Sequence, residues 1–216
     1  MTMNHLSNVD IKNSKTDLPV PVINSVHLHS IYNPEREAQS FVSANEKLIE
    51  KSSQILVFGL GFGYHLISLE TKLKGIFPKG YEVYCIEPNK NLVEKWKELR
   101  PATLSSKIKV INYDEIQDYY KDISLVNFLS NKPTILPHPA SFQLNEAFFK
   151  SFMSFHYPTT VSQSLHFIQD SELKEYLAID GTHETTDEFF KRIENKNFLQ
   201  GKDFLTLALS EMVTGN

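Results

Sequence analysis

Four apolar residues lead directly into alternating glycines in the segment Ile55-Leu56-Val57-Phe58-Gly59-Leu60-Gly61-Phe62-Gly63. The apolar residues do not alternate with polar ones, which is typical of a parallel strand covered on both faces. The glycines end this strand, and residues 64–74 have the apolar spacing of a helix. The segment therefore predicts a strand, a tight turn and a helix, the unit from which open α/β domains are built.

The residues that follow continue this alternation of strands and helices. In chain order we expect a strand at 81–86, a helix at 89–99, a strand at 107–111, a short helix at 114–120, extended segments at 125–129 and 133–136, and an aromatic helix at 143–155. Strands and helices that alternate at this spacing predict an α/β fold with a Rossmann-like, doubly wound, mostly parallel sheet.

A helix is also expected ahead of the first strand. Asn33 is a favourable N-cap residue, and Pro34 suits the first helical position. Glu35 and Glu37 complement the positive end of the helix dipole. Apolar residues at helical spacing extend this helix to about Lys51.

The chain divides into three predicted parts. Residues 1–24 are polar and are expected to form a flexible N-terminal arm. Residues 25–158 are expected to form the Rossmann-like domain, which opens with a short extended segment at 25–31. Residues 159–216 form a mainly helical C-terminal extension, with expected helices at 171–179, 185–193 and 203–213.

The composition limits the class of protein. The 216 residues include 41% hydrophobic residues, enough for a substantial core, and the net charge of −4 gives no reason to expect nucleic acid or an anionic membrane as a partner. No apolar stretch has the length of a membrane span or the form of a signal peptide, so we expect a cytoplasmic protein. The single cysteine, Cys85, lies in an apolar run and is expected to be a core residue.

The glycine turn has the features of a nucleotide site. Gly59, Gly61 and Gly63 allow a sharp turn and a close approach of the backbone to a ligand, and Tyr64 and His65 begin a helix whose amides point toward it. A second strand ends in Glu87-Pro88-Asn89, 24 residues after Gly63. An acidic residue at this strand end is placed to accept hydrogen bonds from ribose hydroxyls, so Glu87 and Asn89 complete the predicted site.

The spacing of the glycines narrows the class of ligand. Tyr64 stands where a dinucleotide-binding turn carries its last glycine, which favours an S-adenosylmethionine-type or mononucleotide-type turn over a nicotinamide or flavin site. The alternative is that the glycines only form a tight turn and bind no ligand.

Three segments resemble one protein family. Residues 29–38, 57–66 and 86–89 are similar to the N-terminal Rossmann-like part of the motility accessory factor (Maf) flagellin glycosyltransferases and to the related 6-hydroxymethylpterin diphosphokinase-like proteins. Residues 135–140, with the aromatic helix after them, resemble the segment that follows in that family. The resemblance implies a nucleotide-sugar ligand, and a longer glycosyltransferase or flagellin as partner. Family members are much longer and carry their sugar-transfer site in a central domain, so the implied role is assistance in sugar transfer.

Other polar residues are weaker candidates. His138 lies between two prolines and could face a ligand at a strand end, with a structural role as the alternative. His65, at a helix start, suits a neutral hydrogen-bonding role, and we expect it at the surface. Asp114 could contact a base or ribose but is better explained as a helix cap. His27 and His29 alternate, but no other metal-ligating residues join them at a recognisable spacing, so the sequence predicts no metal site.

The sequence names no catalytic residue. Three functions remain open at this stage: a nucleotide or nucleotide-sugar binding protein of the Maf type, an S-adenosylmethionine-dependent methyltransferase, and a non-catalytic interaction module.

Overall fold

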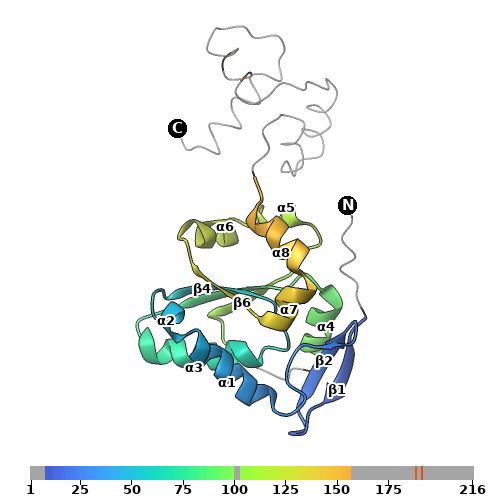
Figure 1. Cartoon of the computed structure of the whole chain (residues 1–216). Helices are drawn as coiled ribbons and strands as arrows, with labels where there is room; N and C mark the ends of the chain where they lie inside the picture. Colours follow the sequence, from blue (N-terminus) through green and yellow to red (C-terminus); the bar gives the residue numbers. More distant parts are fainter. Residues whose placement is uncertain (1–7, 100–102, 157–187, 189–190, 192–216) are drawn as a thin grey trace. The chain divides into compact units, whose positions relative to one another are not determined.

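A computed structural model describes residues 8–99, 103–156, 188 and 191 (Figure 1). The contacts of the chain divide it into residues 1–155 and 156–216, and every helix and strand given below lies in the first of these units. This division falls close to the predicted boundary after residue 158. The predicted helices at 171–179, 185–193 and 203–213 lie outside the described residues, apart from the single positions 188 and 191.

A four-stranded parallel sheet forms the centre of the fold, as the sequence predicted. Its strands are β4 (Gln54–Phe58), β5 (Glu82–Ile86), β6 (Ile108–Ile111) and β7 (Thr134–Pro137), in the order β6-β5-β4-β7. The chain builds outward from β4 through β5 to β6, then crosses back to place β7 on the other side of β4. This reversal makes the space beyond the carboxyl ends of β4 and β7 the topological switch point, where ligands of open α/β sheets commonly bind.

Helices cover both faces of the parallel sheet, which confirms the doubly wound arrangement (Figure 1). The helices are α1 (Pro34–Ala44), α2 (Glu46–Ile49), α3 (Tyr64–Ile76), α4 (Lys90–Leu99), α5 (Ile116–Tyr119), α6 (Ile123–Ser130), α7 (Pro139–Leu144) and α8 (Glu146–Met153). Ile55 and Val57 of β4 pack with residues of α1, α3 and α4, whereas Leu56 and Phe58 pack with residues of α5, α6 and α8. Alternate residues of one strand thus serve two separate cores.

The N-terminal segment differs from the prediction. Residues 10–23 are not a flexible arm but form β1 (Asp10–Asn13) and β2 (Pro19–Ile23), which pair antiparallel with each other and with β3 (Val26–His27). Asn24 and Ser25 both have positive φ, of 50° and 65°, which suits a tight two-residue hairpin turn. The sheet is held because its apolar side chains share a core with Phe62 and Leu92.

One predicted strand is a helix. Residues 125–129 were expected to be extended but belong to α6, whose N-cap Asp122 accepts hydrogen bonds from the backbone N–H groups of Ser124 and Leu125. A short apolar run carries no periodicity that separates a buried strand from a buried helix. The hydrogen bonds to the Asp122 side chain satisfy backbone N–H groups at the start of α6 and thereby favour the helix.

Two predicted helices are each divided by an asparagine. Asn45 separates α1 from α2, and Asn145 separates α7 from α8, where single helices to Lys51 and over 143–155 were expected. Each asparagine side chain donates a hydrogen bond to the carbonyl four residues earlier, at Phe41 and Ser141. The side-chain amide thus satisfies a carbonyl at the end of each helix and favours termination there.

Candidate functional site

The glycine turn lies at the carboxyl end of β4, as predicted. Gly59, Gly61 and Gly63 have φ values of 99°, 51° and 87°, which are unfavourable for residues with a Cβ atom. Gly63 is the N-cap of α3. The three glycines therefore make the strand-to-helix turn that the sequence indicated.

Glu87 lies beside this turn, at the end of β5. Its Oε2 accepts a hydrogen bond from the backbone N–H of Leu60 at 2.8 Å, and its Oε1 accepts one from Asn89 N–H at 2.9 Å. The residue is 0% exposed. Burial raises the pKa of Glu87 to about 7, and the two backbone hydrogen bonds oppose this rise. The predicted neighbourhood is correct, but the carboxylate binds the protein's own backbone.

The space next to the glycines is occupied by side chains of the same chain. A Cβ atom on Gly61 would lie 2.5 Å from Nε2 of His29 and 3.2 Å from Cε1 of His138. A Cβ atom on Gly59 would lie 2.1 Å from Cβ of Ser141. At these two positions the close approach that requires glycine comes from the protein itself, where the sequence suggested an open space for a ligand.

Two other predicted site residues, Asn89 and Tyr64, make hydrogen bonds that support the local structure. Asn89 caps the following helix, because its Oδ1 accepts a hydrogen bond from Leu92 N–H at 3.3 Å. Tyr64 donates its hydroxyl to the carbonyl of Pro19 at 2.9 Å, and burial raises its pKa to about 12. Asp114 is exposed and does not cap a helix, since α5 begins at Ile116 with no side-chain cap. The prediction of a cap at Asp114 was wrong because the helix starts later.

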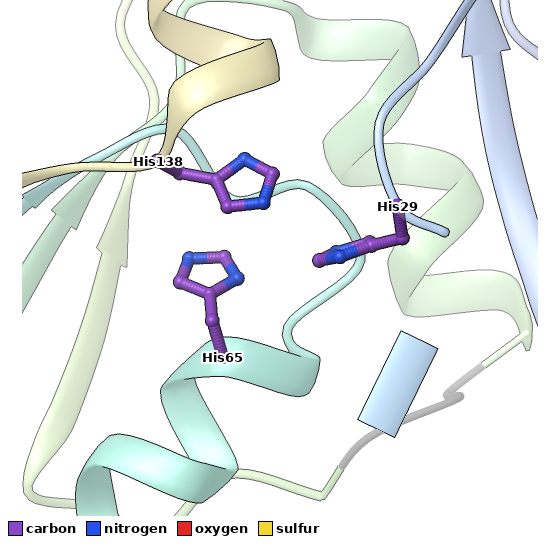
Figure 2. A group of neighbouring side chains, drawn as sticks. All are labelled: His29, His65 and His138. Atoms are coloured by element: carbon purple, nitrogen blue, oxygen red, sulfur yellow. The ribbon is translucent and has the colours of Figure 1, made fainter. Parts of the chain in front are cut away.

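Three buried histidines meet beside the glycine turn (Figure 2). His65 follows β4, His138 follows β7, and His29 follows the N-terminal sheet; they are 0%, 4% and 2% exposed. One ring nitrogen of each lies within 4.8 Å of a ring nitrogen of the others. The rings of His65 and His138 stack, with their centroids 4.3 Å apart. Two of the three histidines thus follow the neighbouring strands that flank the switch point.

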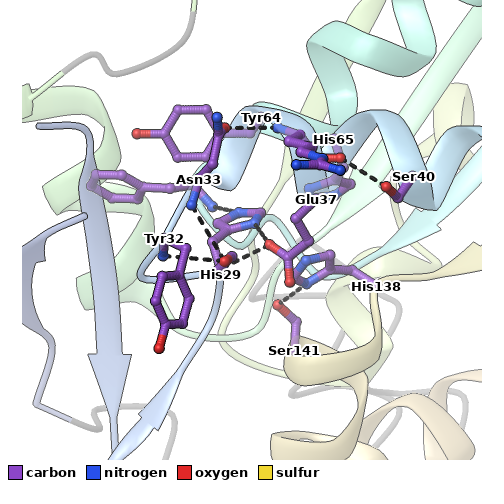
Figure 3. A network of polar contacts seen from close by, with 12 residues as sticks. His29, Tyr32, Asn33, Glu37, Ser40, Tyr64, His65, His138 and Ser141 are labelled. Carbon is purple, nitrogen blue, oxygen red and sulfur yellow. Dashed lines mark hydrogen bonds and ion pairs between the residues drawn. The ribbon is translucent and has the colours of Figure 1, made fainter. Parts of the chain in front are cut away.

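Each histidine is held by a hydrogen bond on one side of its ring, and Figure 3 shows those of His29 and His138. Nδ1 of His29 lies 3.1 Å from Oε2 of Glu37, which also accepts from Ser30 N–H at 2.8 Å. Nε2 of His65 lies 3.1 Å from the carbonyl oxygen of Gly59. Nδ1 of His138 lies 2.9 Å from Oγ of Ser141.

The second ring nitrogens of His29 and His65 differ in their hydrogen bonding. Nε2 of His29 accepts a hydrogen bond from Phe62 N–H at 2.9 Å, so Nδ1 carries the proton that is donated to Glu37. The carbonyl of Gly59 requires the proton of His65 to be on Nε2, which leaves Nδ1 as an acceptor. Within the described part of the chain this buried Nδ1 has no hydrogen-bond partner.

The environment keeps His65 and His138 neutral. Burial, together with the proximity of His29, lowers the pKa of His65 to about 3. Burial and the two neighbouring histidines also lower the pKa of His138 well below its ordinary value. The predicted neutral, hydrogen-bonding role of His65 agrees with this environment, but the expected surface position of His65 was wrong.

The sequence contained part of the signal for this cluster. His65 and His138 each follow a strand, and the carboxyl ends of neighbouring parallel strands share one edge of a sheet. That β7 would neighbour β4 was not visible in the sequence, and nothing indicated that His29 would reach the same place. The sequence predicted no metal site because no other metal-ligating residue joins His27 and His29 at a recognisable spacing, and the tertiary structure brings His65 and His138 to His29.

A pocket among the described residues lies between α1 and α3 and not above the turn. Its lining includes Glu35, Gln39, Ser68 and Lys72, and of the predicted nucleotide-binding residues it includes Tyr64.

Among the described residues, none of the helices combines the length and the apolar character of a membrane span.

Comparison with known proteins gives little beyond the fold. No protein-family model and no curated protein matches the chain. Among solved structures, MnmC2 from Aquifex aeolicus is similar with a TM-score of 0.34 and 23% identity, over 53% of this chain and 45% of MnmC2. The chain thus spans less than half the length of MnmC2.

Proposed function

We propose that the carboxyl edge of the parallel sheet binds a nucleoside-containing ligand of the S-adenosylmethionine type, as in methyltransferases. The contact between Glu87 Oε2 and Leu60 N–H carries this proposal, because it brings the acidic end of β5 against the glycine turn that follows β4. In nucleoside-binding α/β domains these two features hold the ribose and the adjoining part of the ligand.

The order of the strands supports the same edge. β4, β5 and β6 follow one another outward, and β7 returns to the other side of β4, so the turn after β4 stands at the switch point. Tyr64 begins α3 where a dinucleotide-binding turn has its last glycine, and its side chain is 4% exposed. The S-adenosylmethionine type does not require glycine at that position.

Ligand binding must change the surroundings of Glu87. Each carboxylate oxygen can accept a further hydrogen bond besides the one from Leu60 or Asn89. The residue is fully buried, so a ribose reaches it only after the neighbouring side chains move. We therefore expect bound ligand to change the hydrogen exchange of the Leu60 and Asn89 amides.

A nucleotide-sugar ligand of the Maf type is the second candidate. The segments that resemble that family, 29–38, 57–66, 86–89 and 135–140, meet at one place. His29 and Phe62 are hydrogen-bonded, Glu87 contacts Leu60, and the rings of His29 and His138 lie 4.8 Å apart. This convergence favours a shared site for the resembling segments. The role proposed with such a site, assistance in flagellin glycosylation, rests on the resemblance alone.

The third candidate, an interaction module without a small-molecule ligand, is favoured by the occupied space beside the glycines. Ser141 fills the position next to Gly59, and His29 and His138 fill the position next to Gly61. In this interpretation the glycines serve packing alone.

Calorimetric titration of the full chain separates the three candidates. We expect saturable binding of S-adenosylmethionine at one site per chain, with a Kd in roughly the micromolar range, and no heat with cytidine nucleotides. Binding of cytidine nucleotides without S-adenosylmethionine would favour the Maf-type ligand. Silence with both ligands, for a chain whose circular dichroism shows it to be folded, would favour the interaction module.

Matched substitutions on β5 test the site itself. Glu87→Gln should weaken S-adenosylmethionine binding about tenfold, because one acceptor of the carboxylate is lost. Glu82→Gln is the control, since Glu82 lies at the other end of the same strand and pairs with Lys109 at 2.8 Å. Equal effects of the two substitutions on the Kd would contradict the assignment of Glu87.

A further inference from the structure

We propose that His29, His65 and His138 form a binding site for a divalent transition-metal ion, with Zn²⁺ as the best match. The proposal goes beyond nucleoside binding and does not depend on it. It rests on the placement of three ring nitrogens within 4.8 Å of one another in a buried cluster at the switch point (Figure 2).

The distances between the nitrogens suit a metal after a small adjustment. Zinc binds histidine nitrogens at about 2.0–2.1 Å with tetrahedral angles, which places two such nitrogens about 3.4 Å apart. The present limit of 4.8 Å therefore requires ring movements on the order of 1 Å. Neutral imidazoles are good ligands for Zn²⁺, Co²⁺, Ni²⁺ and Cu²⁺ and poor ones for Mg²⁺ or Ca²⁺.

The hydrogen bonds on the outer sides of the rings match those of metal-ligating histidines. Such histidines donate their second N–H to a carboxylate, a backbone carbonyl or another acceptor, which fixes the ring and the proton position. Here Nδ1 of His29 is hydrogen-bonded to Glu37 and Nδ1 of His138 to Ser141 Oγ (Figure 3). Nε2 of His65 is hydrogen-bonded to the carbonyl of Gly59. The other ring nitrogens are Nε2 of His29, Nδ1 of His65 and Nε2 of His138, and of these Nε2 of His29 already accepts a hydrogen bond from Phe62 N–H.

The strongest indication of a ligand at this cluster is the second ring nitrogen of His65. Its Nδ1 is buried and has no hydrogen-bond partner, although buried polar atoms in folded proteins nearly always have one. Because Nε2 donates to Gly59, Nδ1 presents a lone pair. A metal ion between the three rings would satisfy this lone pair.

Metal binding requires one hydrogen bond to be exchanged. Nε2 of His29 accepts from Phe62 N–H at 2.9 Å, and a metal would compete for the same lone pair. The metal would therefore release Phe62 N–H, which lies between Gly61 and Gly63. Metal binding and the conformation of the glycine turn are coupled through this single atom.

The test uses the full chain, stripped with a chelator and titrated with Zn²⁺ alone. We expect one zinc ion per chain, and a Co²⁺-loaded sample should show the visible absorption of a tetrahedral site. His65→Phe, which keeps a ring of similar shape, should weaken zinc binding at least about 100-fold, because one of three ligands is lost. The absence of saturable zinc binding by the folded wild-type chain would overturn the proposal.

Two further substitutions keep the test decisive if His65→Phe does not fold. Glu37→Gln leaves all three histidines in place and alters the carboxylate that His29 shares with Ser30 N–H. The Glu37 side chain is half-exposed, and the substitution should weaken zinc binding roughly 10- to 100-fold. His27→Gln is the control, because His27 lies on β3 outside the cluster and should leave zinc binding unchanged. If His27→Gln weakened binding as much as Glu37→Gln, the zinc would be bound elsewhere and the proposal would be wrong.

Discussion

Oε2 of Glu87 accepts a hydrogen bond from the backbone N–H of Leu60 at 2.8 Å, and this contact ties the end of β5 to the glycine turn after β4. The two residues are far apart in the sequence, and the carboxyl group between them is 0% exposed. Because Glu87 is a fully buried acid between the ends of two strands, its protonation affects the stability of the predicted site.

Glu87 should make the chain less stable as the pH rises toward neutrality. Burial raises its pKa from 4.5 to about 7, so the folded chain holds a proton that the unfolded chain has lost. The corresponding stabilisation is fully present below pH 4.5 and is lost as the pH rises through 7, a change of about 3 kcal/mol in the free energy of unfolding. Glu87→Gln should remove this dependence in urea unfolding measured from pH 5 to pH 8.

The free energies of unfolding of the wild-type chain and of Glu87→Gln must be compared at each pH, because His65 also contributes to the pH dependence. The pKa of His65 is lowered to about 3, so protonation of His65 in the unfolded chain destabilises the fold below about pH 6.5, in the opposite direction. This contribution is common to the wild-type chain and to Glu87→Gln and cancels in the difference. Parallel pH profiles for the two chains would contradict the role assigned to Glu87.

Gly59 should tolerate no side chain, whereas Gly75 should. Gly59 has φ of 99° and a new Cβ atom would lie 2.1 Å from that of Ser141, so Gly59→Ala should cost about 2–5 kcal/mol of stability through backbone strain and overpacking. Gly75, in α3, has nothing within 4 Å of the new atom. Gly75→Ala should stabilise the chain by about 0.5–1 kcal/mol. Thermal unfolding of the two variants measures this contrast, and similar melting temperatures would refute it.

The cap of α1 should contribute measurably to stability. Asn33 Oδ1 accepts a hydrogen bond from Arg36 N–H at 2.9 Å at the start of the helix that carries Glu37. Asn33→Ala should lower the free energy of unfolding by about 1 kcal/mol, and Asn33→Asp should retain most of it because aspartate also caps well. Chemical denaturation compares the three chains. Equal losses for alanine and aspartate would show that the side-chain oxygen is not the cause.

On α8, replacement by alanine should destabilise the chain more at Phe149 than at Met153. It is 0% exposed and stacks on Phe58, with ring centroids 4.7 Å apart, so Phe149→Ala should cost about 3–5 kcal/mol. Met153 is 51% exposed on the same helix, and Met153→Ala should change stability by less than about 0.5 kcal/mol. Denaturant midpoints provide the measurement, and a loss at Met153 equal to that at Phe149 would contradict the packing described.

Much of the α/β framework could be predicted because it is encoded locally. The unalternating run 55–58 indicates a strand covered on both faces, and alternating glycines indicate the left-handed turn that follows it. Asn33 and Pro34 indicate a helix start through hydrogen-bonding capacity and a fixed φ. Each of these signals acts over a few residues, so the sequence is sufficient to read them.

Some local signals were misread. Residues 125–129 have the composition of a buried strand but form part of α6, whose start is capped by the Asp122 side chain. Asn24 and Ser25 form a hairpin turn at the boundary between the expected arm, 1–24, and the expected extended segment, 25–31. In both cases short polar side chains, rather than apolar periodicity, determine the backbone.

The sequence by itself determined the strand, the glycine turn, the capped first helix and an acidic residue at the end of the second strand, because these follow from neighbouring residues. Only the tertiary structure decided that β7 lies beside β4 and brings His138 onto His65, and that the N-terminal sheet delivers His29 to the same place. It also decided that Glu87 bonds to Leu60. These contacts join residues from separate elements, and their geometry depends on how the whole core packs.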